Sequence, residues 1–143
     1  MLIRLGLIPF ALLGAGGAAS AQSCASPPIA PALAAPADMR AKSAAEAAAA
    51  KHDAFVEIRN WQADLKTYRA CLTNVGNEAR RQVSTLDPAK DADKIAGLQQ
   101  QGMAATHQYD LTVDMEERVV NEFHAVQAAY CARSDVDKSS CPK

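Results

Sequence analysis

The chain has 143 residues, of which 15 are basic and 16 are acidic, so its formal net charge is −1. This balance provides neither a basic patch for nucleic acid nor a block of like charge that would attract an oppositely charged partner. The length suits a single domain. We therefore expect one folded unit that does not bind nucleic acid.

Residues 1–21 have the composition of a secretory signal peptide. Arg4 precedes an apolar run from residue 5 to about residue 13, and the residues at 19–21 form an A-x-A cleavage site. The apolar run is shorter than the roughly 20 residues that a membrane-spanning helix needs. We predict cleavage after Ala21, no stable membrane span afterwards, and export to the periplasm or the extracellular space.

Residues 22–37 form a proline-rich segment, called the strap. It contains four prolines: Pro27, Pro28, Pro31 and Pro36. Proline keeps the backbone extended, lacks an N–H group that would need a partner, and reduces the entropy lost when the segment docks. We expect the strap to run back along the first helix, with Ile29 beside residues 55–58 and Leu33 beside residues 47–51.

The first long helix is predicted over about residues 38–85. Asp38 is its expected N-cap, because it follows the last proline of the strap and precedes strong helix formers. Apolar residues then recur at steps of three and four, the coiled-coil spacing of a helix that lies along a partner. They are Ile58, Trp61, Leu65, Tyr68, Leu72, Val75, Ala79 and Leu86, with Gln82 breaking the series before Leu86.

The second long helix is predicted over about residues 88–133. Asp87 is its expected N-cap, because the residue before a proline leaves the helical region and Pro88 suits the first helical position. The apolar spacing repeats, with Glu116 as a flaw in the middle. The apolar positions are Ile95, Leu98, Gly102, Ala105, Tyr109, Thr112, Val119, Phe123, Val126 and Tyr130. No segment alternates like a strand, so the predicted fold class is all-α.

The predicted architecture is a long antiparallel two-helix hairpin over residues 38–133, because a short link makes long helices antiparallel neighbours. With the turn centred near Asp87, bulky side chains should face small ones or the alanine-rich part of the first helix. The expected pairs are Tyr68 with Ala105, Leu72 with Gly102, Phe123 with Lys51, and Tyr130 with Ala44. The alternative is a three-helix bundle, in which Gly97 and Gly102 break the second helix.

Four cysteines in a small exported chain predict two disulfides. An extended strap from Cys24 to the helix start spans ~43 Å at ~3.1 Å per residue, and the helix from there to Cys71 spans ~50 Å at ~1.5 Å per residue. These similar lengths predict a Cys24–Cys71 bond. Cys131 then pairs with Cys141 and closes a C-terminal tail over residues 134–143. A Cys71–Cys131 bond would require the three-helix alternative.

The N-terminal half of the exported chain carries a series of weak motifs. Cys24 and the strap are followed by Asp38-Met39 at the helix start and by the sequence YRACL at 68–72. This series resembles a group of small exported bacterial helical proteins of uncharacterised function, over residues 24–72. The resemblance implies the same Cys24–Cys71 pair and supplies no activity. A second cysteine pair is not an expected feature of that group.

Residues that suggest chemistry are few. Six polar residues recur at steps of three or four on the second helix, a spacing that places pairs of metal ligands on one face. They are His107, Asp110, Asp114, Glu117, Asn121 and His124. Because one helix face lacks the convergent ligands of a tight site, metal binding is a remote alternative. We expect no enzyme and no cofactor, since no catalytic or phosphate-binding pattern is present.

Two functional classes stay open. The favoured one is a non-catalytic structural or protein-interaction module of the cell envelope, which binds an unknown protein partner or itself. Its contacts would use apolar residues beside the two helical seams, Val56, Val83, Val113 and Val120. The alternative is a holdase-like periplasmic chaperone. Its clients would bind aromatic residues in an outer groove, namely Trp61, Tyr68, Tyr109 and Tyr130.

Overall fold

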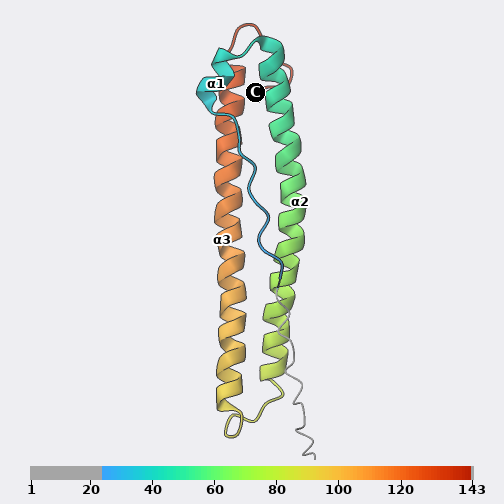
Figure 1. Ribbon diagram of the computed structural model, residues 1–143, viewed down its shortest axis with the longest axis vertical. Helices are drawn as coiled ribbons and strands as arrows, with labels where there is room; N and C mark the ends of the chain where they lie inside the picture. Colours follow the sequence, from blue (N-terminus) through green and yellow to red (C-terminus); the bar gives the residue numbers. More distant parts are fainter. Residues whose placement is uncertain (1–23, 143) are drawn as a thin grey trace, which may run out of the picture.

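The protein is a long helical hairpin. A computed structural model describes residues 24–142, and the predicted signal peptide lies outside these residues. The helices are α1 (Pro36–Ala41), α2 (Ala44–Val83) and α3 (Ala92–Cys131). Figure 1 shows α2 and α3 side by side and antiparallel along the length of the molecule. The predicted all-α fold is confirmed, and the described part of the chain has no strand.

The start of the first long helix differs from the prediction. The N-cap of α1 is Ala35, Pro36 occupies the first helical position, and Asp38 lies in the first turn rather than at the cap. The chain then leaves the helical conformation at Lys42 and Ser43, whose ψ angles are 155° and 162°. The predicted uninterrupted helix from residue 38 is therefore wrong, because a second N-terminus forms at residue 44.

A capping box causes this second start. The Ser43 hydroxyl accepts a hydrogen bond from the Glu46 backbone N–H, and the Glu46 carboxylate accepts one from the Ser43 N–H at 2.9 Å. This exchange satisfies two backbone donors that a helix start leaves without partners. The sequence signal was the serine three residues before a glutamate, and it was overlooked inside an alanine-rich stretch.

The capping box should make the start of α2 sensitive to acid. The pKa of Glu46 is lowered below its ordinary value of 4.5, mainly by its hydrogen bond with the Ser43 hydroxyl and to a smaller extent by the one from the Ser43 backbone N–H. A carboxyl group with a lowered pKa stabilises the folded state fully above its ordinary pKa and loses this contribution as the pH falls through the lowered value. The protection factor of the Ala47 amide, which corrects for the intrinsic pH dependence of exchange, should therefore fall as the pH drops below about 4.5. Glu46→Gln should remove this pH-dependent change. A change of unchanged size in the variant would contradict the role of Glu46 in it.

The turn between the long helices also differs in detail. Asp87 does not cap α3, which begins four residues beyond the predicted Pro88 start and has Asp91 as its N-cap. Asp87 instead closes a separate turn: its side chain accepts from the Ala89 N–H at 2.9 Å, and its carbonyl accepts from the Asp91 N–H at 2.8 Å. α3 then runs without interruption through Gly97 and Gly102, so the three-helix alternative is wrong.

The core is a row of small clusters along the α2–α3 interface. One cluster contains Met39, Ala47, Val126, Ala129 and Tyr130; the next Ile58, Trp61, Leu65 and Val119; the last Leu72, Val75 and Ala105. Most of these residues belong to the predicted helical seams. The exception that matters is Met39, which is fully buried and brings α1 against the end of α3.

The register between the helices is shifted from the prediction. Lys51 lies over the Tyr130 ring at 4.2 Å rather than opposite Phe123, which instead packs with Phe55 at 6.3 Å. Gly102 approaches Ala79 rather than Leu72. Partners on α3 therefore lie one to two helical turns further along the chain than expected. The expectation assumed a symmetric turn at Asp87, whereas the extra turn before α3 makes the connection asymmetric.

Candidate functional site

Two disulfides hold the N-terminal and C-terminal segments against the hairpin. Cys24 pairs with Cys71 and Cys131 with Cys141, with Cα–Cα distances of 5.9 and 5.8 Å. Both pairs are the predicted ones: Cys24–Cys71 from the lengths of the strap and the helix, and Cys131–Cys141 as the remaining pair across a short C-terminal loop. Each bond fixes a segment that has no regular secondary structure, so the two disulfides determine which surfaces of the hairpin are covered.

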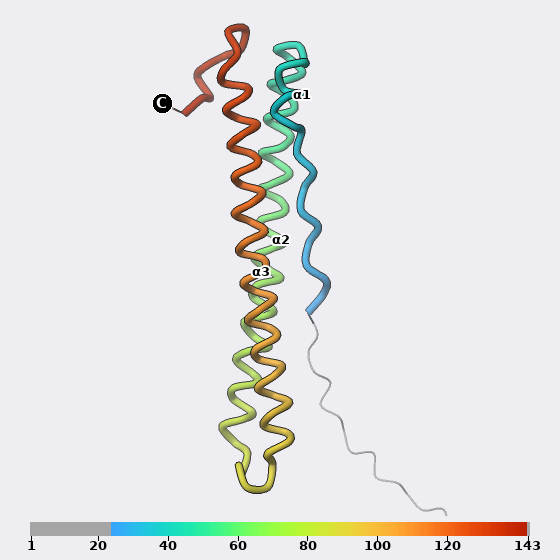
Figure 2. The backbone as a smooth tube through the Cα atoms, turned by 90° about the vertical axis from the view of Figure 1, so that its left-hand side faces the viewer, coloured from blue at the N-terminus to red at the C-terminus, as the bar shows by residue number. Residues whose placement is uncertain are grey.

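The strap lies in the groove between α2 and α3, and not along α2 alone. Figures 1 and 2 show it running along the hairpin from α1 toward Cys24. Ala30 and Leu33 pack on the cluster around Trp61, and the Trp61 indole N–H donates to the Pro28 carbonyl at 3.3 Å. Leu33 also contacts the cluster around Tyr130. The strap therefore completes the core on this side of the hairpin.

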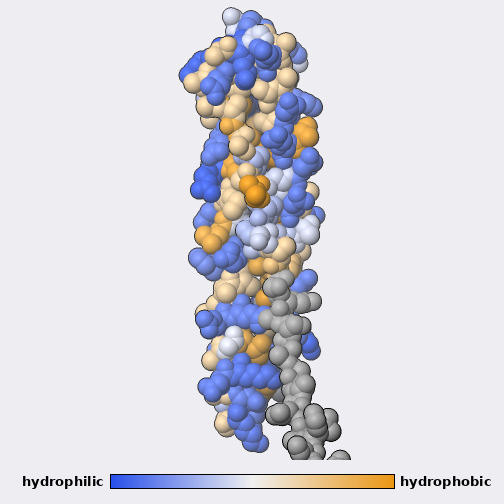
Figure 3. All heavy atoms as spheres, in the orientation of Figure 1, coloured by the Kyte–Doolittle hydropathy of each residue, from blue (hydrophilic) through white to orange (hydrophobic). Residues whose placement is uncertain are grey.

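The expected position of Ile29 needs correction. Its side chain is 93% exposed, and the neighbouring Pro28 and Ala30 make the contacts with α2 instead. In an extended segment successive side chains point to opposite sides, so contact by Ala30 turns Ile29 outward. Figure 3 shows this face: apolar residues gather along the middle of its upper half, and hydrophilic residues extend across its lower end.

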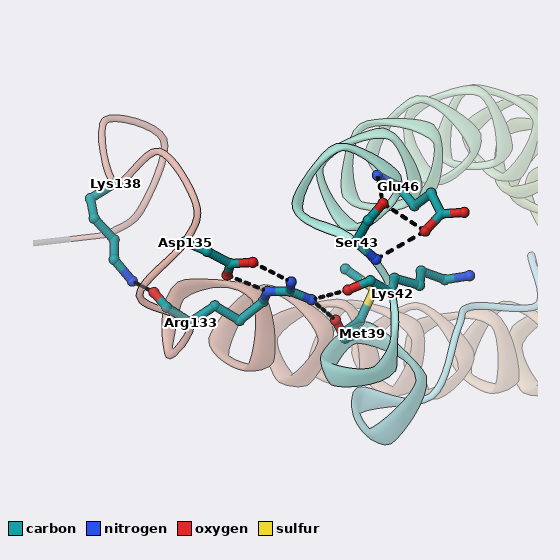
Figure 4. Close-up of polar contacts among 7 residues, drawn as sticks. All are labelled: Met39, Lys42, Ser43, Glu46, Arg133, Asp135 and Lys138. Carbon is teal, nitrogen blue, oxygen red and sulfur yellow. Dashed lines mark hydrogen bonds and ion pairs between the residues drawn. The ribbon is translucent and has the colours of Figure 1, made fainter.

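Arg133 locks α1 to the end of α3 (Figure 4). Its guanidinium donates to the carbonyls of Met39 and Lys42, each at 2.7 Å, and holds both oxygens of Asp135 at 2.9 and 2.7 Å. These carbonyls belong to the C-terminal end of α1, where a cation is favourable. The hydrogen bonds from Arg133 lower the pKa of the Asp135 carboxyl.

The C-terminal tail folds back over the same end of the hairpin. Val136 and Cys141 pack on the Met39 cluster, and the Lys51 ammonium donates to the Ser140 hydroxyl at 2.5 Å. Lys138 donates to the Cys131 and Arg133 carbonyls at the end of α3. The tail and α1 together close this end of the molecule.

The second groove between α2 and α3, called the open groove, is not occupied by the strap. Its α2 wall contains Phe55, Gln62, Arg69 and Gly76, and its α3 wall contains Gly102, Tyr109, Glu116 and Phe123. Arg69 and Cys71 are two residues apart, which is about 200° around a helix, so the open groove and the strap lie on opposite sides of α2. Three pairs span the groove: Phe55 with Phe123, Gln62 with Glu116, and Arg69 with Tyr109.

A polar network occupies the middle of the open groove. Arg69 donates to the Glu116 carboxylate at 2.5 Å and to the hydroxyl and carbonyl of Thr112 at 2.8 and 2.7 Å. Gln62 donates to the other Glu116 oxygen at 2.8 Å, and the guanidinium lies 5.6 Å from the centre of the Tyr109 ring. Glu116, the flaw in the predicted seam, is thus the partner of Arg69, which the sequence analysis missed.

A hollow lies at the end of the open groove nearest the turn. Gly76, Ala79 and Gly102 contribute to it, together with apolar side chains such as Val83 and Met103, and its volume is about 640 Å³. A Cβ atom added at Gly76 would meet nothing within 4 Å. Small residues therefore leave space here that large residues fill elsewhere along the hairpin. Met103 is 66% exposed beside this space.

The residues considered for metal binding do not converge. All six are exposed along α3: His107, Asp110, Asp114, Glu117, Asn121 and His124. His107 and Asp110 lie on the rim of the hollow. Within residues 24–142, no three histidine, cysteine, aspartate or glutamate side chains lie close enough together to hold a metal ion.

The aromatic residues considered for client binding separate into two groups. Trp61 and Tyr130 are buried in the core, and Tyr68 packs partly buried beside Leu72. Tyr109 is 37% exposed in the open groove. Of the four valines expected to border the seams, Val56 and Val113 are exposed, whereas Val83 and Val120 are half-buried.

Comparison of the chain with protein-family models, curated proteins and solved structures finds no match. None of the helices in residues 24–142 combines the length and the apolar character that crossing a bilayer would require.

Proposed function

We propose that the chain is exported after removal of residues 1–21 and acts as a non-catalytic protein-interaction module of the cell envelope. Two disulfides support an oxidising compartment, because such bonds persist in exported proteins and are rare in the cytosol. The coiled-coil spacing of both helices supports an extended, rod-like scaffold.

The open groove is the observation that carries this proposal. The chain covers the groove on one side of the hairpin with its own strap. On the other side the C-terminal tail reaches Lys51, and the groove is uncovered from Phe55 toward the turn. The uncovered side presents apolar residues at both ends, including Phe55 at 51% and Met103 at 66% exposure. Between them the polar side chains are already paired. Exposed apolar surface with ordered polar groups is typical of protein contact sites.

A photo-crosslinking amino acid placed at Met103 tests the proposal in intact cells. We expect discrete adducts in the envelope fraction, because Met103 borders the open groove. Ile29 is the matched control, since it is more exposed and lies on the strap side, where random collisions would label it at least as strongly. Equal labelling at both positions, or no adduct at either, would overturn the interaction site.

Export and the chaperone alternative are distinguished by separate measurements. Mass spectrometry of the exported protein should find Gln22 at its N-terminus, whereas an intact Met1 in the membrane fraction would contradict export. A holdase should suppress aggregation of an unrelated reduced protein at stoichiometric amounts and give adducts of many sizes. A specific interaction module should do neither.

A further inference from the structure

The open groove repeats with a seven-residue spacing on both of its walls. Along α2 the residues are Phe55, Gln62, Arg69 and Gly76; along α3 they are Gly102, Tyr109, Glu116 and Phe123. Each series begins or ends with a large aromatic residue, has two polar residues in the middle, and has glycine at the other end. Since the helices are antiparallel, both phenylalanines lie at one end of the groove and both glycines at the other.

From this order we propose that two copies of the chain pack through their open grooves as an antiparallel, two-fold symmetric dimer. The proposal rests on the interaction role proposed above and identifies the partner as a second copy. An isologous interface requires a surface that is complementary to itself when it is turned around. The order large, polar, polar, small has this property, because reversal places the large end on the small one.

The reversal pairs each residue with a suitable counterpart. Phe55 and Phe123 of one copy enter the hollow beside Gly76 and Gly102 of the other. The hollow has a volume of about 640 Å³, and the Phe55 side chain is 51% exposed. A parallel dimer would instead place phenylalanine on phenylalanine and leave two hollows facing each other. Close packing of large against small residues favours the antiparallel arrangement.

Charges in the centre of the groove agree with the same arrangement. Turning the groove around places Arg69 opposite Gln62 of the second copy, and that Gln62 holds Glu116 through a 2.8 Å hydrogen bond. The Arg69 guanidinium of each copy therefore approaches the Glu116 carboxylate of the other. Tyr109 of each copy likewise lies opposite Glu116 of the other copy, to which the Tyr109 hydroxyl can donate. Each polar residue at the centre thus meets a complementary group, as a buried interface requires.

The area of the open groove is also close to what each partner buries in a stable dimer. The face from Phe55 to Gly76 extends for about 32 Å, or about 37 Å with a further turn beyond Gly76, at about 1.5 Å per residue. It ends at Phe55 on the other side, because the C-terminal tail lies at Lys51. Two adjacent helices of about 10 Å diameter make it about 20 Å wide. The resulting area of roughly 640–740 Å² per copy is close to the ~800 Å² that each partner buries in a typical specific complex. The product would be a four-helix bundle with a strap on each outer side.

Sedimentation equilibrium of the purified mature chain tests the proposal with paired glycine variants. Gly76→Leu fills the hollow, so it should raise the dimer dissociation constant about tenfold or more. It should leave the monomer folded, because nothing lies within 4 Å of an added Cβ. Gly97→Leu is the matched control: it makes the same change on α3 at a position that is equally open and outside the hollow. This variant should leave the dissociation constant unchanged.

A size exchange tests the antiparallel order itself. Phe55→Ala should weaken the dimer, and Phe55→Ala combined with Gly76→Phe should restore it, because the two positions meet only in the reversed arrangement. A monomeric wild-type chain, a dimer insensitive to Gly76→Leu, or no recovery in the exchanged variant would overturn the proposal. If the chain is monomeric while Met103 still crosslinks to another envelope protein, only the dimer fails and the interaction role stands.

Discussion

Replacing both Cys24 and Cys71 with serine should lower the free energy of unfolding by about 4 kcal/mol and release the strap from the hairpin. The bond closes a loop of 47 residues, so its loss enlarges the conformational freedom of the unfolded chain. In the folded protein, release of the strap would then be opposed by the contacts of Ala30 and Leu33 with the core and by the Trp61–Pro28 hydrogen bond.

The Trp61 indole N–H reports on the strap directly, because its hydrogen-bond partner is the Pro28 carbonyl. Its hydrogen exchange should accelerate in the Cys24→Ser, Cys71→Ser variant while the amides in the middle of α3 stay protected. The control is Cys131→Ser with Cys141→Ser, which opens a loop of only 10 residues at the end of the hairpin. That change should cost about 3 kcal/mol and leave the indole signal unaltered. Unchanged indole exchange in the first variant would mean that packing alone holds the strap.

Trp61→Ala should destabilise the protein by about 3–5 kcal/mol, a typical cost for removing a large buried aromatic residue. Trp61 is 5% exposed and lies in the cluster where α2, α3 and the strap meet. Its loss leaves a cavity beneath the strap and removes the hydrogen bond to Pro28. Urea unfolding followed by the helical circular dichroism signal measures the change.

Two further variants provide reference values for the stability cost of Trp61→Ala. Trp61→Phe retains an aromatic ring and loses the hydrogen bond, so it should cost only about 1–2 kcal/mol. Val113→Ala changes an exposed residue of α3 and should stay within about 0.5 kcal/mol of the wild type. A cost below about 1 kcal/mol for Trp61→Ala would show that the strap and hairpin are not joined through this residue.

Much of the fold could be predicted because its signals are local in the sequence. The three-and-four spacing that contains Trp61 and Val119 identifies the buried faces of both long helices. The lengths of the strap and the first helix were sufficient to pair Cys24 with Cys71, since each segment has a known rise per residue. One local signal was overlooked: the capping box at Ser43 and Glu46, which divides the predicted first helix in two.

The candidate site could be predicted only in part. The apolar character of the rims was visible from the composition of the helices, but half of the four expected valines are half-buried. The ion pair between Arg69 and Glu116 joins residues that are 47 positions apart, and no local pattern marks that pairing. Similarly, nothing near Arg133 in the sequence indicates that it binds the carbonyls of Met39 and Lys42.

The sequence by itself determined the helical class, the faces that are buried and the two disulfides, because these follow from backbone periodicity and chain length. Tertiary structure alone decided the register between α2 and α3, and with it the identity of the open groove. A heptad pattern permits several registers that differ by whole turns, each of which keeps the same faces buried. The choice among them depends on side chains that meet across the interface, such as Gly102 against Ala79 and Phe55 against Phe123. Those contacts exist only once both helices are in place.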